Sequence, residues 1–174
     1  MGLRHSGRSI MPSTPRDWSD AFLEQAREDL RAAYALPASD CPSTLCMLLQ
    51  MVFEKLAKAA FARAGAPNAN SHQVATRLFL LLERNPSGKK LLQATPNVRQ
   101  FVTELENAHP AVANRSSPPW PRLEYPWEDA TGQVLYPARD LPLARRVRNP
   151  SDRILVDCLK FASAFEKQLT TIIP

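Results

Sequence analysis

The chain has 174 residues, of which 44% are hydrophobic, enough for one domain with a packed core but short for two. No stretch approaches the roughly 18 consecutive apolar residues of a membrane-spanning helix, so we expect a soluble protein with no membrane association. Sixteen prolines against five glycines favour helices separated by prolines over a sheet. The net charge of +5 permits an acidic partner such as nucleic acid without requiring one.

The three cysteines, Cys41, Cys46 and Cys158, lack metal-ligand spacing, and two fall in or beside apolar helical runs, where a free thiol packs as a small hydrophobic group. We therefore expect a reduced, cytoplasmic protein. The N-terminal segment has no apolar stretch of the kind that a secretory signal needs. The sequence predicts a disordered tail over 1–14, with Met11 as an alternative start, and a single domain over 15–174.

The first predicted helix begins after Thr14, with Pro15 at the first helical position and Asp17 in the first turn, which is typical of a helix N-terminus. Its apolar pattern ends near Leu36, before Pro37. The short connection that follows makes the first two helices antiparallel neighbours.

The second predicted helix, 43–65, has the longest uninterrupted helical pattern in the chain. On it Gln50, Glu54 and Lys58 recur every four residues, so they form a polar stripe, with Glu before Lys in the favourable order. A solvated face with one salt bridge is the simpler interpretation of this stripe. A functional surface is the alternative.

The third predicted helix opens after Asn70, which with Gln73 matches the pattern of a capping box. It ends near Arg84, because the Asn-Pro-Ser-Gly sequence at 85–88 is typical of a turn. A short helical turn at 89–93 follows.

The fourth predicted helix begins after Pro96 and extends to about Ala108. The last helix begins at Asn149-Pro150 and carries an apolar stripe to Ile172. The pattern therefore predicts an all-α fold, an antiparallel bundle of about five helices with a long proline- and aromatic-rich loop before the last one.

That loop, 114–150, contains seven prolines, which exclude a long helix. Its two tryptophans and two tyrosines, Tyr125 among them, favour an ordered loop packed on the bundle. A short hairpin that pairs 123–125 with 133–136 is the expected local structure.

Arginines gather between the aromatic residues of this loop and the last helix, at positions 139, 145, 146, 148 and 153. Arg145 and Arg146, with aromatic side chains nearby in sequence, are candidates to contact the phosphates and bases of RNA. The alternatives are a solvated surface, or arginines that pair with Glu128 and Asp129 and fix the loop in place.

The order of residues in and after the second helix resembles a known family. Gln50, Glu54-Lys55, Lys58-Ala59, Gly65 and Ser71-His72 look like the second-helix signature of the HEPN family of small helical-bundle domains. The resemblance covers about 17–72 well and the C-terminal third loosely. It implies a homodimer and binding roles for the polar stripe and His72. Because family members often pair with a minimal nucleotidyltransferase, it also implies such a protein partner.

Two departures separate the chain from HEPN ribonucleases, which resemble one another in having an arginine, then four to six residues, then a histidine. The only histidines are His5, His72 and His109, and none has an arginine at that spacing. The loop before the last helix has Glu124-Tyr125-Pro126 where many members have Arg-Tyr-Pro, so a phosphate site there loses its positive charge. The nuclease activity of the family is therefore not carried over.

The histidines also have ordinary interpretations. His72 at a helix start suits local hydrogen bonding, and His109 at a helix end suits the helix dipole. No spacing of His, Cys, Asp and Glu suggests zinc, and no glycine-rich phosphate loop is present. We therefore predict no catalytic residue, metal or cofactor, and an enzyme is the less favoured class.

Two functions remain open from the sequence. The first is a non-catalytic HEPN-like binding module of a toxin–antitoxin or phage-defence system, which binds a protein partner, a nucleotide or RNA. The second is a metal-independent RNase in which Arg145 and Arg146 meet His72 or His109 through folding or across a dimer. A purely structural interaction protein is a third.

Overall fold

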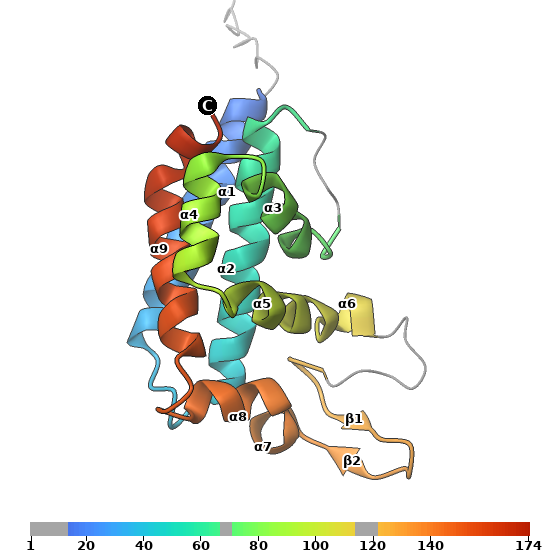
Figure 1. Ribbon diagram of the computed structural model, residues 1–174. Helices are drawn as coiled ribbons and strands as arrows, with labels where there is room; N and C mark the ends of the chain where they lie inside the picture. The colour runs from blue at the N-terminus through green and yellow to red at the C-terminus, as the bar shows by residue number, and fades with distance from the viewer. Residues whose placement is uncertain (1–13, 67–70, 114–121) are drawn as a thin grey trace, which may run out of the picture.

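The structure, a computed structural model, describes residues 14–66, 71–113 and 122–174. In these ranges the chain forms nine helices and one two-stranded hairpin, which confirms the predicted all-α helical bundle (Figure 1). The predicted tail, apart from Thr14, lies outside the described residues. The elements are α1 (Pro15–Ala35), α2 (Pro42–Arg63), α3 (Ala75–Leu82), α4 (Pro86–Ala94), α5 (Val98–Asn107), α6 (Pro110–Ala113), β1 (Trp127–Glu128), β2 (Val134–Leu135), α7 (Pro137–Asp140), α8 (Pro142–Arg148) and α9 (Ile154–Ile172).

Helix α2 is the centre of the bundle and packs against α1, α3, α5, α8 and α9 (Figure 1). Its apolar residues cover most of its circumference, as expected for a helix buried on several sides. Those that are buried in the core are Leu45, Cys46, Leu49, Val52, Phe53, Leu56, Ala57, Ala59, Ala60 and Ala62. A polar residue on this helix therefore has to find its partners inside the protein.

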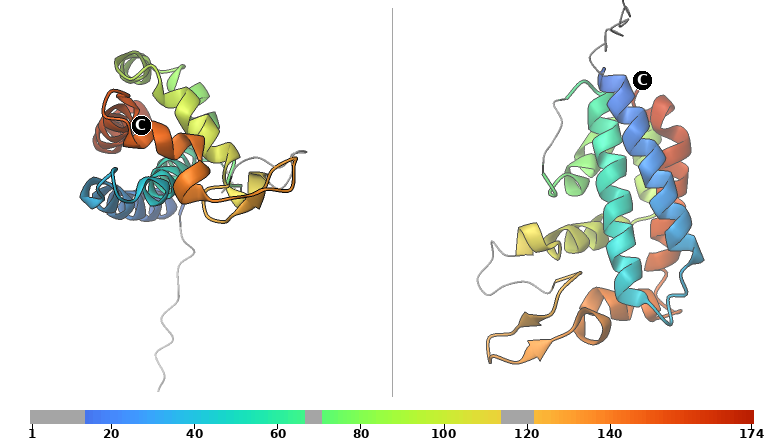
Figure 2. Two further views of the ribbon diagram at one scale, coloured as in Figure 1. Left: turned by 90° about the horizontal axis from the view of Figure 1, so that it is seen from below. Right: turned by 180° about the vertical axis from the view of Figure 1, so that it is seen from behind.

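Helix α1 lies along α2, as the view from behind shows (Figure 2). Its start is as predicted: the Thr14 hydroxyl accepts a hydrogen bond from the Asp17 N–H, and the Asp17 carboxylate accepts one from the Thr14 N–H at 2.7 Å. Between the helices, Lys55 of α2 forms an ion pair with Asp29 of α1.

The segment after α2 departs from the prediction in two places. Helix α3 begins at Ala75, later than expected, and the predicted cap Asn70 lies outside the described residues. The Asn-Pro-Ser-Gly sequence opens α4 instead of forming a turn: the Asn85 side chain accepts hydrogen bonds from the N–H groups of Ser87 and Gly88. A Cβ on Gly88 would lie 2.5 Å from the Leu82 carbonyl oxygen, so this corner requires glycine.

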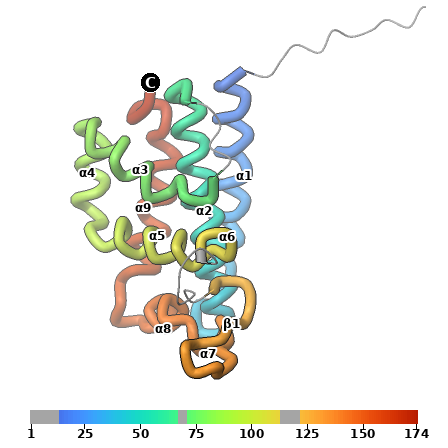
Figure 3. The backbone as a smooth tube through the Cα atoms, turned by 90° about the vertical axis from the view of Figure 1, so that its right-hand side faces the viewer, coloured from blue at the N-terminus to red at the C-terminus, as the bar shows by residue number. Residues whose placement is uncertain are grey.

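Helix α5 crosses α2 at about its middle and is followed by the short α6, which begins at Pro110 (Figure 3). Where the chain is next described, the Leu123 N–H donates to the Ala108 carbonyl oxygen at 3.0 Å. Leu123 and Trp127 are buried, so the predicted packing of the aromatic loop on the bundle is confirmed for this part.

A hairpin is present, but its first strand is not the one predicted. Strand β1, and not 123–125, pairs antiparallel with β2, with Trp127 opposite Leu135. The turn between them contains Gly132 at φ +81°, a left-handed conformation that favours glycine. The hairpin and α7 project from the lower end of the bundle (Figure 1).

The start of α9 is also later than predicted. The Asn149 N–H donates to carbonyl oxygens of α8, so Asn149 ends one helix rather than starting the next. The Asp152 carboxylate accepts from the Ile154 N–H at 3.0 Å, which places a carboxylate at the first turn of α9. Helices α7 and α8 were not expected from the sequence.

Among the described residues, no helix combines the length and the apolar character needed to cross a membrane. All three cysteines are free thiols. Burial raises the pKa of the Cys46 thiol to about 12, so this residue acts as part of the core and not as a nucleophile.

Candidate functional site

The polar stripe of α2 is not a solvated face, so that interpretation was wrong. Gln50 is only 4% exposed, and the side chains of Glu54 and Lys58 are 12% and 19% exposed. The Glu54 carboxylate is the centre of the stripe. Its Oε2 accepts a hydrogen bond from the Gln50 amide at 2.9 Å, and its Oε1 pairs with the Lys58 ammonium at 2.7 Å.

His72 joins this stripe from outside α2. Its Nδ1 lies 3.1 Å from Glu54 Oε2, and because a carboxylate only accepts, Nδ1 carries the proton. Burial pushes the pKa of Glu54 upward, but the hydrogen bonds from Lys58, Gln50 and His72 outweigh it and leave the pKa below its usual value. Glu54 is therefore ionised at neutral pH.

His109, at the corner between α5 and α6, completes the group. Its ring stacks on that of His72, with centroids 4.1 Å apart and planes 16° apart. Its Nδ1 accepts a hydrogen bond from the Ala111 N–H at 3.2 Å, so the neutral ring carries its proton on Nε2. Burial, and then the charge of His72, lower the pKa of His109. The predicted role of a charged helix-end histidine is therefore wrong.

We call these five residues, Gln50, Glu54, Lys58, His72 and His109, the polar cluster. One donor atom each from Glu54, His72 and His109 lies within 4.8 Å of the others. Such a group can orient an imidazole with a carboxylate or hold a metal ion. The sequence offered no spacing for it, because the three residues come from separate segments that only the fold brings together.

The surroundings of the polar cluster are negative. Glu106 of α5 is buried and accepts hydrogen bonds from the Ala75 and Thr76 N–H groups at the start of α3. Burial raises the pKa of Glu106, and the charge of Glu54 acts in the same direction, although the bonds at α3 oppose both. The charge of Glu124 also reaches the polar cluster, where it acts to raise the pKa of His109 against the larger effect of burial. Three carboxylates therefore face one ammonium, Lys58, which favours a cation at the cluster over a phosphate.

A second group of charged and aromatic residues lies on α7 and α8, and Arg145, predicted as a binding residue, is among them. The Arg139 guanidinium lies over the Tyr136 ring, 4.8 Å from its centroid, and Tyr136 is 47% exposed. Arg145 and Arg148 of α8 are also exposed. We call Tyr136, Arg139, Arg145 and Arg148 the basic face. The sequence singled out Arg145 but not the contact between Tyr136 and Arg139, which their three-residue spacing could have suggested.

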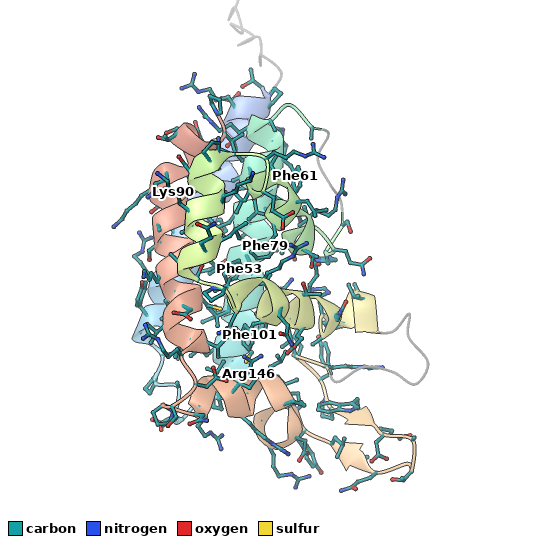
Figure 4. The ribbon with its side chains drawn as sticks, in the orientation of Figure 1. Phe53, Phe61, Phe79, Lys90, Phe101 and Arg146 are labelled. Carbon is teal, nitrogen blue, oxygen red and sulfur yellow. The ribbon has the colours of Figure 1, made fainter. Side chains whose placement is uncertain are left out.

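Arg146, predicted as a binding residue together with Arg145, makes contacts within the bundle that Arg145 does not, so we leave it out of the basic face. Its guanidinium bonds to the Asp152 carboxylate at 3.0 Å and pairs with Glu104 of α5 at 3.6 Å. It also lies over the ring of Phe101, 5.3 Å from the centroid (Figure 4). Arg146 therefore holds α8 against α5 and the start of α9.

The alternative in which these arginines pair with Glu128 and Asp129 is wrong for the contacts described. The Asp129 carboxylate accepts from the Thr131 and Gln133 N–H groups and closes the hairpin turn, and Arg139 pairs with Asp140 at 2.9 Å. Tyr125 is 57% exposed, as a binding residue has to be.

The fold and these two surfaces define an all-α bundle protein with a partly buried histidine–carboxylate cluster and a separate exposed basic face. No protein-family model, curated protein or solved structure matches the chain. Its function is therefore argued from the two surfaces themselves.

Proposed function

We propose that the protein is a HEPN-like helical-bundle module that binds single-stranded RNA through its basic face and does not cleave it. One observation carries this proposal: the Arg139 guanidinium lies 4.8 Å from the centroid of the exposed Tyr136 ring. The following helix α8 adds two further exposed arginines, Arg145 and Arg148. A base stacks on an aromatic ring or a guanidinium plane, while neighbouring arginines contact the phosphates.

The charge balance of this region supports the same ligand. Residues 137–148 carry four arginines and one acid, Asp140, which Arg139 pairs with. Arg145 and Arg148 are left to meet phosphates, since Arg146 is held by Asp152 and Glu104. The polar cluster is less suited to RNA, because its carboxylates repel phosphate.

Fluorescence anisotropy with a labelled single-stranded RNA tests the proposal. The double variant Arg145→Ala with Arg148→Ala should bind about tenfold more weakly. The control is Lys89→Ala with Lys90→Ala, which removes the same charge from exposed positions of α4 (Figure 4). Equal affinity of the two double variants, or no RNA binding by the wild type, would refute the proposal.

A metal-independent RNase is the second candidate, favoured by the stacked pair of histidines. The His72 Nδ1–H donates a hydrogen bond to Glu54, so its unprotonated Nε2 can take the proton of a 2′-hydroxyl. To give its Nε2 proton to the leaving 5′ oxygen, as the 2′-oxygen–phosphorus bond forms and the phosphorus–5′-oxygen bond breaks, His109 has to be an imidazolium with both ring nitrogens protonated. Burial lowers the pKa of His109 and opposes that form, which makes this candidate the less favoured one. Lys58 would stabilise the phosphate charge.

This candidate is separated from the first by incubating RNA with the protein in EDTA. Cleavage to a 2′,3′-cyclic phosphate and a 5′-hydroxyl, lost in His109→Gln, would establish the nuclease. Intact RNA with retained binding supports the non-catalytic module.

The HEPN-like proposal includes a nucleotidyltransferase-type partner, a homodimer and a cytoplasmic, toxin–antitoxin or defence context. The homodimer would have to use a surface other than the α2 stripe, because that stripe is covered by the same chain. Purification from the native host with and without nuclease, followed by sedimentation analysis, tests the partner and the dimer together. A partner that survives nuclease supports the proposal, and a lone monomer opposes it.

A further inference from the structure

We propose that Glu54, His72 and His109 form a binding site for a divalent transition metal ion of the zinc type. The three side chains come from α2, the segment before α3 and the α5–α6 corner, and one donor atom of each lies within 4.8 Å of the others. This inference goes beyond RNA binding by the basic face and does not depend on it.

The geometry between Glu54 and His72 is close to that of two ligands on one ion. With metal–ligand distances of about 2.0–2.2 Å, two donors of a tetrahedral zinc lie roughly 3.4 Å apart. Glu54 Oε2 and His72 Nδ1 are 3.1 Å apart, so an ion can take the place of the shared proton after a small side-chain rotation. The imidazole proton then moves to Nε2, and no net proton release is needed.

The two remaining members of the polar cluster, Gln50 and Lys58, hold the Glu54 carboxylate in place. Lys58 binds Oε1, the oxygen that does not face His72, and Gln50 donates to Oε2. Such outer contacts fix the orientation of a metal-binding carboxylate. Lys58 therefore acts as a positioning residue and need not be displaced.

His109 provides the third donor after its ring turns out of the stack on His72, because a metal ion lies in the plane of each imidazole that binds it. Ligation through Nε2 moves its proton to Nδ1 and gives up the contact with the Ala111 N–H, which is a moderate 3.2 Å. The bond to a metal is far stronger than this hydrogen bond.

The donor set and the charges select the kind of ion. Two imidazoles suit zinc, cobalt, nickel or copper better than magnesium or calcium, which prefer oxygen ligands. Glu54, Glu106 and Glu124 supply the negative field that a dication needs. The His72 side chain is 46% exposed, which leaves an entry path and room for a water ligand.

Titration of the full-length, untagged protein with Co²⁺ and Zn²⁺, after treatment with EDTA and its removal, tests the site. Calorimetry gives the stoichiometry, and the visible spectrum of Co²⁺ reports imidazole and carboxylate ligands. Cys41→Ser is used as the background, because Cys41 is the one thiol that is not fully buried. We expect one ion per chain and a higher melting temperature with zinc.

The variants His72→Gln, His109→Gln and Glu54→Gln should each weaken binding at least about tenfold. His5→Gln, the remaining histidine of the chain, is the matched control and should leave affinity unchanged. Absence of binding, or binding that all three cluster variants leave intact, would overturn the metal site. RNA anisotropy on the same samples in EDTA keeps the two proposals separate, because loss of the metal site leaves the basic face in place.

Discussion

The polar cluster and the basic face are both rich in charge, but they are built in opposite ways. The polar cluster is mostly covered by the chain, with His72 as its exposed member. Its members contact one another and come from segments as far apart as Gln50 and His109. The basic face lies within 136–148, is exposed, and has few internal contacts besides Arg139 with Tyr136 and Asp140.

Because of this difference, substitutions in the two groups should affect different quantities, the free energy of unfolding in one and the affinity for a ligand in the other. A buried, fully paired charge is expensive to leave without its partner, so changes in the polar cluster should act on the free energy of unfolding. An exposed arginine contributes little to the fold, so changes in the basic face should act on ligand affinity alone. The predictions below test this separation.

The largest effect is expected from Glu54→Ala. The variant leaves the Lys58 ammonium and the Gln50 amide without their acceptor, and we expect a loss of about 2–3 kcal/mol in the free energy of unfolding. Urea denaturation measures it. Glu28→Ala on α1, an exposed glutamate, is the control and should change stability by less than about 0.5 kcal/mol. Equal stability of the two variants would show that the cluster is not the paired network described above.

The second prediction concerns the basic face and salt. Removing Arg145 and Arg148 together should leave the unfolding free energy within about 0.5 kcal/mol of the wild type. In RNA titrations at several salt concentrations, the slope of log affinity against log salt should become shallower by about 1.4, because each phosphate contact to a single strand contributes about 0.7. An unchanged slope would mean that neither arginine meets a phosphate.

Features of the fold that depend on contacts between residues near in sequence could be predicted, and features that depend on contacts between distant residues could not. The first two helices were predicted nearly to the residue, because Thr14, Pro15 and Asp17 act on one turn and Pro37 ends the pattern. Asn85 and Asn149 were harder, because an Asn-Pro pair fits a turn, a helix start or a helix end. At Asn85 the choice is made by packing of Gly88 on Leu82.

The polar cluster was only half visible in the sequence. The four-residue spacing of Gln50, Glu54 and Lys58 was evident, but their burial was not, since it depends on helices that surround α2 on several sides. A binding role for His72 was suggested by the resemblance to the HEPN signature. Nothing local in the sequence places His109 on His72, because that contact requires α5 to cross α2 and to bring its C-terminal end to the segment before α3.

The third prediction separates two adjacent arginines. Arg146→Ala removes the bonds to Asp152 and Glu104 and the contact with Phe101, and should lower the unfolding free energy by about 1 kcal/mol. Arg145→Ala, its exposed neighbour, should leave stability unchanged and weaken RNA binding. Thermal unfolding and anisotropy on the two single variants give the comparison. The reverse assignment, with Arg145 stabilising and Arg146 binding, would contradict it.

The smallest effect is a pH dependence that arises beside the polar cluster, at Glu106. Burial raises the pKa of this carboxyl above its ordinary value of 4.5, so the folded state holds its proton more tightly than the unfolded state does. Ionisation therefore opposes folding, and the stability contribution of protonated Glu106 is lost as the pH rises through the folded pKa. Glu106→Gln cannot ionise, although it rearranges the hydrogen bonds to Ala75 and Thr76 by a constant amount.

The stability of the variant relative to the wild type should thus increase between about pH 4 and pH 7. Urea denaturation of both proteins across this range measures the difference, in which other groups such as Glu54 cancel to first order. A difference that is flat with pH would mean that the bonds at the start of α3 balance the burial of Glu106 completely. A difference that falls with pH would mean that those bonds exceed it, and that Glu106 belongs with Glu54 among the carboxylates that this fold holds ionised.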